Sequence, residues 1–206
     1  MQASVLEKLL TDWNPHFEDV RRGAWKGTIP RQKYLKTLKE LMDIRHTIVL
    51  SGVRRAGKSV LMQQLAGWLI EEQDVPPQNV VYLFLEDIQV SQYLALGADL
   101  LESLYTYYLE RYNPAGRVYL LLDEIQGVKD FNRWVGSRYE RKENIKFIIS
   151  GSRRSLIESE SATVLTGRNV QIDVYPFNFY EYLLVHDVDV RGEETARSVK
   201  RARRNY

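Results

Sequence analysis

The chain has 206 residues, 44% of them hydrophobic and 27% charged, with a net charge of +2, which is the composition of an ordinary globular domain. So small a net charge gives no argument for nucleic acid, and the lack of cysteine excludes disulfides and thiolate metal sites. No apolar run approaches the roughly 20 residues of a membrane span, and the first residues lack a signal-peptide pattern, so we expect a cytoplasmic protein without a membrane partner.

Residues 1–28 are predicted to form a short helix followed by polar, basic sequence, an N-terminal segment ahead of the main domain. Pro30 begins a second helical pattern, because apolar residues recur after it at the i, i+3 and i+4 spacing of one helix face. Farther along, short apolar runs alternate with helical stretches. The predicted strands are TIVLSG, NVVYLFL, RVYLLLDE, KFIISGS and VQIDVY, and the predicted helices span residues 59–70, 94–112, 131–141 and about 178–186.

The five apolar runs are continuous rather than alternating, which is typical of parallel strands buried on both faces. Because they alternate with helices, the sequence predicts a three-layer α/β domain with a parallel five-stranded sheet and right-handed crossovers. We place this domain at residues 29–187. We expect residues 188–206 to be a basic tail or the beginning of a linker to a C-terminal domain. That tail can bind nucleic acid, although a solvated end explains the same charge.

The stretch SGVRRAGKSV follows the first predicted strand and matches G-x-x-x-x-G-K-[ST], the P-loop pattern. Glycines let the backbone curl so that N–H groups point toward an anion, and the following helix adds the positive end of its dipole. Lys58 would reach the β- and γ-phosphates of a nucleotide, and the Ser59 hydroxyl would hold Mg²⁺. The alternative is a turn with solvated basic residues, but the strand before it and the helix after it favour the P-loop. The predicted nucleotide-binding residues of the loop are Gly52, Arg55, Ala56, Gly57, Lys58, Ser59 and Val60.

Two acidic residues, Asp123 and Glu124, end the third predicted strand, at the sheet edge where open α/β domains bind ligands. Asp123 would hold Mg²⁺ through water, and Glu124 would polarise the attacking water as a general base. Acids at a helix start explain the pair equally well when it is taken alone. The P-loop upstream favours the catalytic interpretation.

Polar residues also follow the fourth strand. Ser152 is our candidate for contact with the γ-phosphate or the attacking water, although serine is common in any turn of this kind. Arg168 is the candidate arginine finger, acting in cis or in trans, and Arg153 and Arg154 compete for that role. A solvated arginine explains each of the three as well.

Six stretches occur in an order that resembles archaeal and bacterial AAA-superfamily ATPases of the G-x-R-R-x-G-K-[ST] type, a group similar to STAND and origin-recognition (Orc-type) ATPases. They are IPRQKYL, GVRRAGKS, LLLDEIQ, ISGSRRSL, LTGR and YPFNFYEYL, from about Ile29 to Leu184. The resemblance implies the strand order 5-1-4-3-2, ATP with Mg²⁺, Glu124 as the catalytic acid and Ser152 as the sensor. It also implies that Pro30 and Arg31 lie near the adenine and that a C-terminal domain carries the biological output.

Two functions follow from these features. The first is an ATPase that hydrolyses ATP to ADP and phosphate and couples the cycle to a C-terminal effector domain, another copy of the chain or a partner. The second is a nucleotide-dependent switch or binding module with little turnover. The Asp-Glu pair favours the ATPase, because a pure binder has no need of Glu124. A small-molecule kinase is weaker, since no arginine-rich lid is placed for an acceptor.

Overall fold

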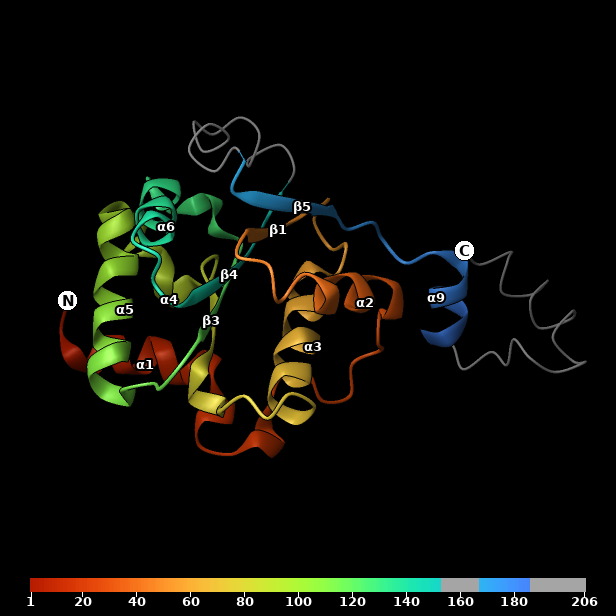
Figure 1. Cartoon of the computed structure of the whole chain (residues 1–206), viewed down its shortest axis with the longest axis horizontal. Coiled ribbons are helices and arrows are strands. Elements are labelled where there is room, and N and C mark those ends of the chain that lie inside the picture. Colours follow the sequence, from red (N-terminus) through yellow and green to blue (C-terminus); the bar gives the residue numbers. More distant parts are fainter. Residues whose placement is uncertain (153–166, 186–206) are drawn as a thin grey trace, which may run out of the picture.

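A computed structural model describes residues 1–152 and 167–185. Five strands form one sheet in the order β2-β3-β4-β1-β5, and every neighbouring pair is parallel (Figure 1). From the opposite edge this order is 5-1-4-3-2, so the predicted fold class and strand order are confirmed. The strands are β1 (Thr47–Ser51), β2 (Val80–Phe84), β3 (Val118–Asp123), β4 (Ile145–Gly151) and β5 (Asn169–Asp173).

Helices cover both faces of the sheet, as the continuous apolar strands predicted (Figure 1). Successive strand residues face opposite layers, so Val49 packs in one hydrophobic cluster while Ile48 and Leu50 pack in the other. The cluster around Ile48 is covered by α2 (Gln32–Glu40) and α3 (Lys58–Glu71), and the cluster around Val49 by α1 (Ala3–Trp13), α5 (Ala98–Tyr112) and α6 (Phe131–Glu140).

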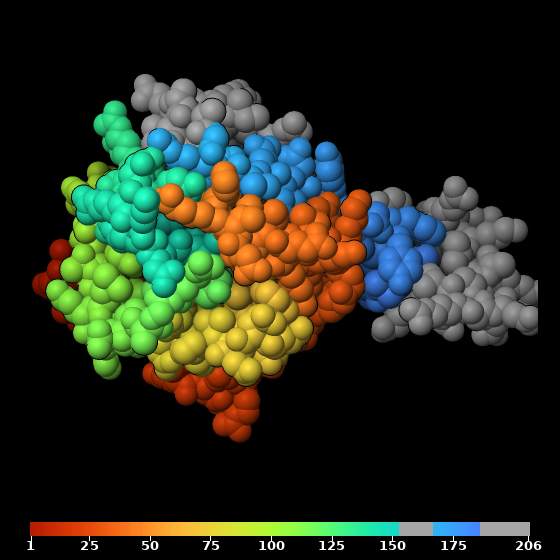
Figure 2. All heavy atoms as spheres, viewed as in Figure 1, coloured from red at the N-terminus to blue at the C-terminus, as the bar shows by residue number. Residues whose placement is uncertain are grey.

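The remaining helical segments are short. They are α4 (Ile88–Ser91), α9 (Phe179–Val185) and the 3-10 turns η1 (Pro15–Phe17), η2 (Val20–Arg22), η3 (Pro77–Asn79), η4 (Leu94–Leu96) and η5 (Ile125–Gly127). Figures 1 and 2 place α9 beside the segment that carries α2, at one end of the body. Within the described residues, no helix has both the length and the apolar character that a membrane crossing requires.

The predicted helix over residues 94–112 is wrong in its first turn. Gly97 has a φ of +56°, which separates η4 from α5. A Cβ at this position would lie 2.9 Å from the carbonyl oxygen of Lys129, so both the φ and the close approach require glycine. The sequence did not predict α4, because a helix of four residues carries too little periodicity to be seen.

The N-terminal segment closes the open edge of β2, the outermost strand on that side. The Asn14 side chain donates to the Tyr82 carbonyl at 2.9 Å and accepts from the Tyr82 N–H at 2.7 Å. The His16 ring lies 2.8 Å from the Val80 carbonyl oxygen. These contacts imitate a neighbouring strand and satisfy groups that an exposed edge would leave open. Because α1 also packs in the main core, residues 1–28 are part of the same body as the sheet.

Candidate functional site

The predicted P-loop occupies the short connection between the end of β1 and the start of α3. Gly52 lies against the chain that leaves β5, and a Cβ there would come within 2.2 Å of the Val174 carbonyl oxygen. Gly57 has a φ of +89° and Arg55 a φ of +65°, so the loop turns through the left-handed region twice before α3 begins. The backbone therefore curls at the helix amino terminus, as an anion-binding loop requires.

Lys58 projects from the first turn of α3 and is buried, with its ammonium satisfied by protein groups. Its Nζ lies 3.1 Å from Oε1 of Glu124 and 3.3 Å from the carbonyl oxygens of both Gly52 and Val53. An ammonium has three N–H donors, so these three acceptors use its full capacity. A phosphate that approaches Lys58 must replace them.

Asp123 is fully buried at the end of β3 and accepts two hydroxyl hydrogen bonds. Tyr82 from β2 donates to Oδ2 at 2.6 Å, and Ser150 from β4 donates to Oδ1. Burial and the Asp123 charge raise the pKa of Tyr82, against hydrogen bonds with Gln63 and Ser59 that lower it. The Tyr82 hydroxyl thus joins Ser59 to Asp123, the two predicted Mg²⁺ residues, and the cluster consists of the hard oxygen donors that this ion prefers.

Glu124 follows directly and has an unusual backbone. Its φ of +53° lies in the left-handed region, where non-glycine residues are uncommon and cluster at functional sites. The backbone N–H donates to the Ser150 hydroxyl at 3.1 Å, while Oε2 accepts from the Gln126 amide at 2.8 Å. With Oε1 on Lys58, the carboxylate is held at both oxygens.

The end of β4 brings two serines to this edge in different roles. Ser51 pairs with Gly151, so Ser152 follows β4 at the same sheet edge at which the P-loop follows β1. Ser150 is buried and supports Asp123 and Glu124. The sequence predicts a phosphate contact for Ser152, but it predicts no role for Ser150 or Tyr82. The role of Ser150 could have been predicted from its place one residue before the end of β4, because this place buries its hydroxyl beside the neighbouring strand.

Arg168 is not brought to the P-loop. It precedes β5, where its carbonyl accepts from the Thr47 N–H at the amino end of β1, and its guanidinium pairs with Glu140 at 2.6 Å. The P-loop lies at the opposite end of β1, roughly 13 Å of strand away. Arg168 therefore lies at the sheet edge opposite to the P-loop in this structure, and its role as an arginine finger, in cis or in trans, stays a prediction. Arg153 and Arg154 lie outside the described residues.

The two residues predicted near the adenine differ in their surroundings. Pro30 is exposed ahead of α2, while the Arg31 side chain is buried beneath the P-loop and donates to the Ala56 carbonyl at 2.7 Å. Val60 lies partly exposed in the first turn of α3. Contact of these residues with a nucleotide base stays a prediction.

Known proteins share this architecture. A family model described as an AAA domain matches residues 44–183. An uncharacterized protein from Haemophilus influenzae is 34% identical over 166 residues, which cover 80% of this chain and 40% of that protein. This chain therefore spans about two fifths of that relative.

Two solved structures are similar in fold. The ADP complex of Hsp104 from S. cerevisiae superposes with a TM-score of 0.58 at 16% identity, covering 88% of this chain and 32% of that one. AMPPCP-bound DnaA from Aquifex aeolicus gives a TM-score of 0.53 at 17% identity, covering 86% and 59% respectively. At such low identities these likenesses show the fold alone.

The family match includes the P-loop, both acidic residues and most of α9, and it covers more than half of the chain. A nucleotide-binding role for the loop is supported by the match together with the geometry. The chain belongs to the AAA domain family.

Proposed function

We propose that this domain binds ATP with Mg²⁺ and hydrolyses it to ADP and phosphate. The observation that carries the proposal is the contact of 3.1 Å between Lys58 and Glu124 at the carboxyl edge of the sheet. It joins a cation suited to phosphate with a carboxylate suited to accept a proton, beside a curled loop at a helix amino terminus. Gly52, Arg55, Ala56, Gly57 and Val60 complete the loop that surrounds the phosphates.

Each residue has a proposed part in the reaction. Lys58 leaves Glu124 and binds the β- and γ-phosphates, which frees the carboxylate to face the attacking water. Glu124 takes a proton from that water as its oxygen attacks the γ-phosphorus, and the bond from phosphorus to the bridging oxygen of ADP breaks. Ser152 contacts the γ-phosphate or the water.

Ser59 and Asp123 are the residues that would hold Mg²⁺, with Asp123 acting through water because both its oxygens already accept hydroxyl hydrogen bonds. When bound, the ion neutralises charge on the phosphate oxygens. The preference for ATP rests on the family likeness. Pro30 would border the adenine, and Arg168 would act on the site of a neighbouring copy.

A second candidate is a nucleotide-dependent switch with little turnover by itself. The same ion pair favours it, because Lys58 and Glu124 satisfy each other without a phosphate and Glu124 is also held by Gln126. In that case turnover waits for a C-terminal domain, a second copy or another partner that releases Glu124.

The test compares ATP binding and steady-state hydrolysis with Mg²⁺ for the wild type, Lys58→Ala and Glu124→Gln. Glu102→Gln is the matched control, since this carboxylate pairs with Arg138 of α6 and has no proposed part in the reaction. We expect Lys58→Ala to lose binding and Glu124→Gln to lose turnover while keeping binding. If the wild type binds ATP but shows no turnover that Glu124→Gln can reduce, the result would support the switch. A wild type that binds no nucleotide would overturn both candidates.

A further inference from the structure

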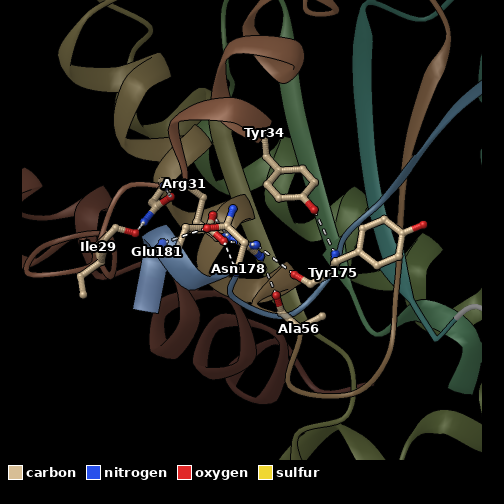
Figure 3. Close-up of polar contacts among 8 residues, drawn as sticks. Ile29, Arg31, Tyr34, Ala56, Tyr175, Asn178 and Glu181 are labelled. Atoms are coloured by element: carbon tan, nitrogen blue, oxygen red, sulfur yellow. Dashed lines mark hydrogen bonds and ion pairs between the residues drawn. The ribbon is translucent and has the colours of Figure 1, made fainter. Parts of the chain in front are cut away.

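Arg31 is among the most buried charged residues that the structure describes, with 1% of its surface exposed, and it lies directly behind the P-loop. Figure 3 shows its guanidinium between the carbonyl of Ala56 and the carboxylate of Glu181. The arginine also donates to the Tyr175 carbonyl at 2.9 Å and stacks near the Tyr34 ring at 4.5 Å. The guanidinium donates four hydrogen bonds in all, and together they fix both its position and its orientation.

The bond to Ala56 fixes the orientation of one P-loop peptide. Nη1 of Arg31 lies 2.7 Å from the Ala56 oxygen, and the same nitrogen also lies beside Gly57, where a Cβ would meet it at an ordinary contact distance of 3.4 Å. In a trans peptide the carbonyl of one residue and the N–H of the next point in opposite directions. Arg31 therefore turns the Gly57 N–H to the side of the loop away from itself, which is the side that the proposed phosphates occupy.

The other half of the guanidinium is held by α9. Glu181 binds it with both oxygens, at 2.9 Å from Nε and 3.1 Å from Nη2. Glu181 also accepts from the Asn178 N–H at 2.9 Å, while the Asn178 side chain accepts from the Glu181 N–H at 2.9 Å. This reciprocal pair is a capping box, so the carboxylate that orients Arg31 is the one that starts α9. Burial alone would raise the pKa of Glu181, but the hydrogen bonds from Arg31 and Asn178 outweigh it and lower the pKa.

We propose that Arg31 is a positioning residue of the nucleotide site, which holds the Ala56–Gly57 peptide ready for phosphate, and that α9 controls this readiness through Glu181. The inference rests on the proposed nucleotide binding and adds a route by which the C-terminal side of the domain regulates it. Removal of α9 from Arg31 leaves the guanidinium without its carboxylate, and the peptide becomes free to turn. Nucleotide binding and the contact of α9 with Arg31 are therefore coupled, so each must stabilise the other.

The experiment measures ADP affinity by calorimetry, and melting temperature, for the wild type, Arg31→Lys, Glu181→Gln and the double variant. Arg138→Lys is the matched control, because Arg138 is also buried, pairs with Glu102 at 2.5 Å and stacks on Trp134 at 4.3 Å, far from the P-loop. All these variants are expected to melt at lower temperature. Only those at Arg31 and Glu181 should weaken ADP binding, by about tenfold.

The double variant tests whether Arg31 and Glu181 affect ADP binding through one shared contact or independently of each other. Because both side chains act through one contact, it should bind ADP no more weakly than the weaker-binding single variant. A second measurement needs no substitution: ADP should slow hydrogen exchange in α9 of the wild type and leave α6 unchanged.

Two results would overturn the inference. If Arg31→Lys and Glu181→Gln bind ADP as the wild type does while melting earlier, the contact serves stability alone. If ADP leaves exchange in α9 unchanged, α9 is not coupled to the site. A wild type that binds no ADP is a different failure, because it removes the proposed function together with this inference.

Discussion

The ammonium of Lys58 lies 3.1 Å from the carboxylate of Glu124, so the proposed phosphate-binding cation and the proposed base neutralise each other. Both are largely buried, at 3% and 13% side-chain exposure, which strengthens their attraction relative to a surface pair. A nucleotide must compete with Glu124 for Lys58. The contact thus ties nucleotide affinity to the residue that is proposed to act in catalysis.

This competition predicts that Glu124→Gln binds ATP more tightly than the wild type. The substitution removes a negative charge that both occupies Lys58 and repels the phosphates, so we expect about a two- to tenfold lower Kd. Turnover should fall by about 100-fold or more, because the amide cannot accept the proton. Calorimetry with ATP and a phosphate-release assay measure the two quantities. Weaker ATP binding by Glu124→Gln would contradict the competition, even if turnover is lost.

Ser150 supplies the second prediction. Its hydroxyl donates to Asp123 and accepts from the Glu124 N–H, so it fixes both acidic residues from β4. Ser150→Ala leaves a buried carboxylate oxygen and a buried N–H without this partner, and we expect a loss of about 1–3 kcal/mol in the free energy of unfolding. Turnover should fall while ATP affinity changes little. Denaturant unfolding and steady-state kinetics test this, and Ser103→Ala is the control, since this exposed hydroxyl donates to the Asp99 carbonyl within α5 and should affect neither quantity.

The fold was predictable because its signals are local. Each strand is a continuous apolar run, and alternation with helices fixes a parallel sheet, whereas the strand order came from the family resemblance. The P-loop carries its chemistry within eight consecutive residues. The location of Arg168 could have been predicted from the sequence. A residue just before a parallel strand lies at the amino edge of the sheet, whereas the P-loop follows another strand and lies at the carboxyl edge.

The supporting residues could not be predicted in this way. Tyr82 meets Asp123 across 41 positions of sequence, and Arg31 meets Glu181 across 150. Such pairs depend on register and on which face each side chain takes, and no local pattern encodes them. Asn14 is a similar case, since a single polar side chain that imitates a strand leaves no periodic trace.

His16 predicts a pH dependence of stability. Burial lowers its pKa, and this outweighs the hydrogen bond with the Val80 carbonyl, which raises it. Below pH 6.5 the unfolded chain therefore binds a proton that the folded chain does not, and stability falls as the pH falls, by at most about 1.4 kcal/mol per pH unit. The His16→Gln variant lacks this titrating group. The difference in unfolding free energy between the wild type and His16→Gln should therefore change below pH 6.5 and stay constant above pH 7.5. A difference that does not vary with pH would contradict the prediction.

Gly52 gives the last prediction, because this P-loop glycine lies directly against the chain that leaves β5. A Cβ there would lie 2.2 Å from the Val174 carbonyl oxygen, whose residue also donates its N–H to the Ser51 carbonyl. Gly52→Ala must therefore push β5 and the P-loop apart, at a cost of about 1–3 kcal/mol in unfolding free energy. Because the segment after β5 leads to Glu181, ADP affinity should fall together with stability. Calorimetry and denaturant unfolding measure both. Gly127→Ala is the control, since its Cβ would meet only Leu94 at an ordinary 3.5 Å, and equal effects of the two substitutions would show that the contact with Val174 has no special role.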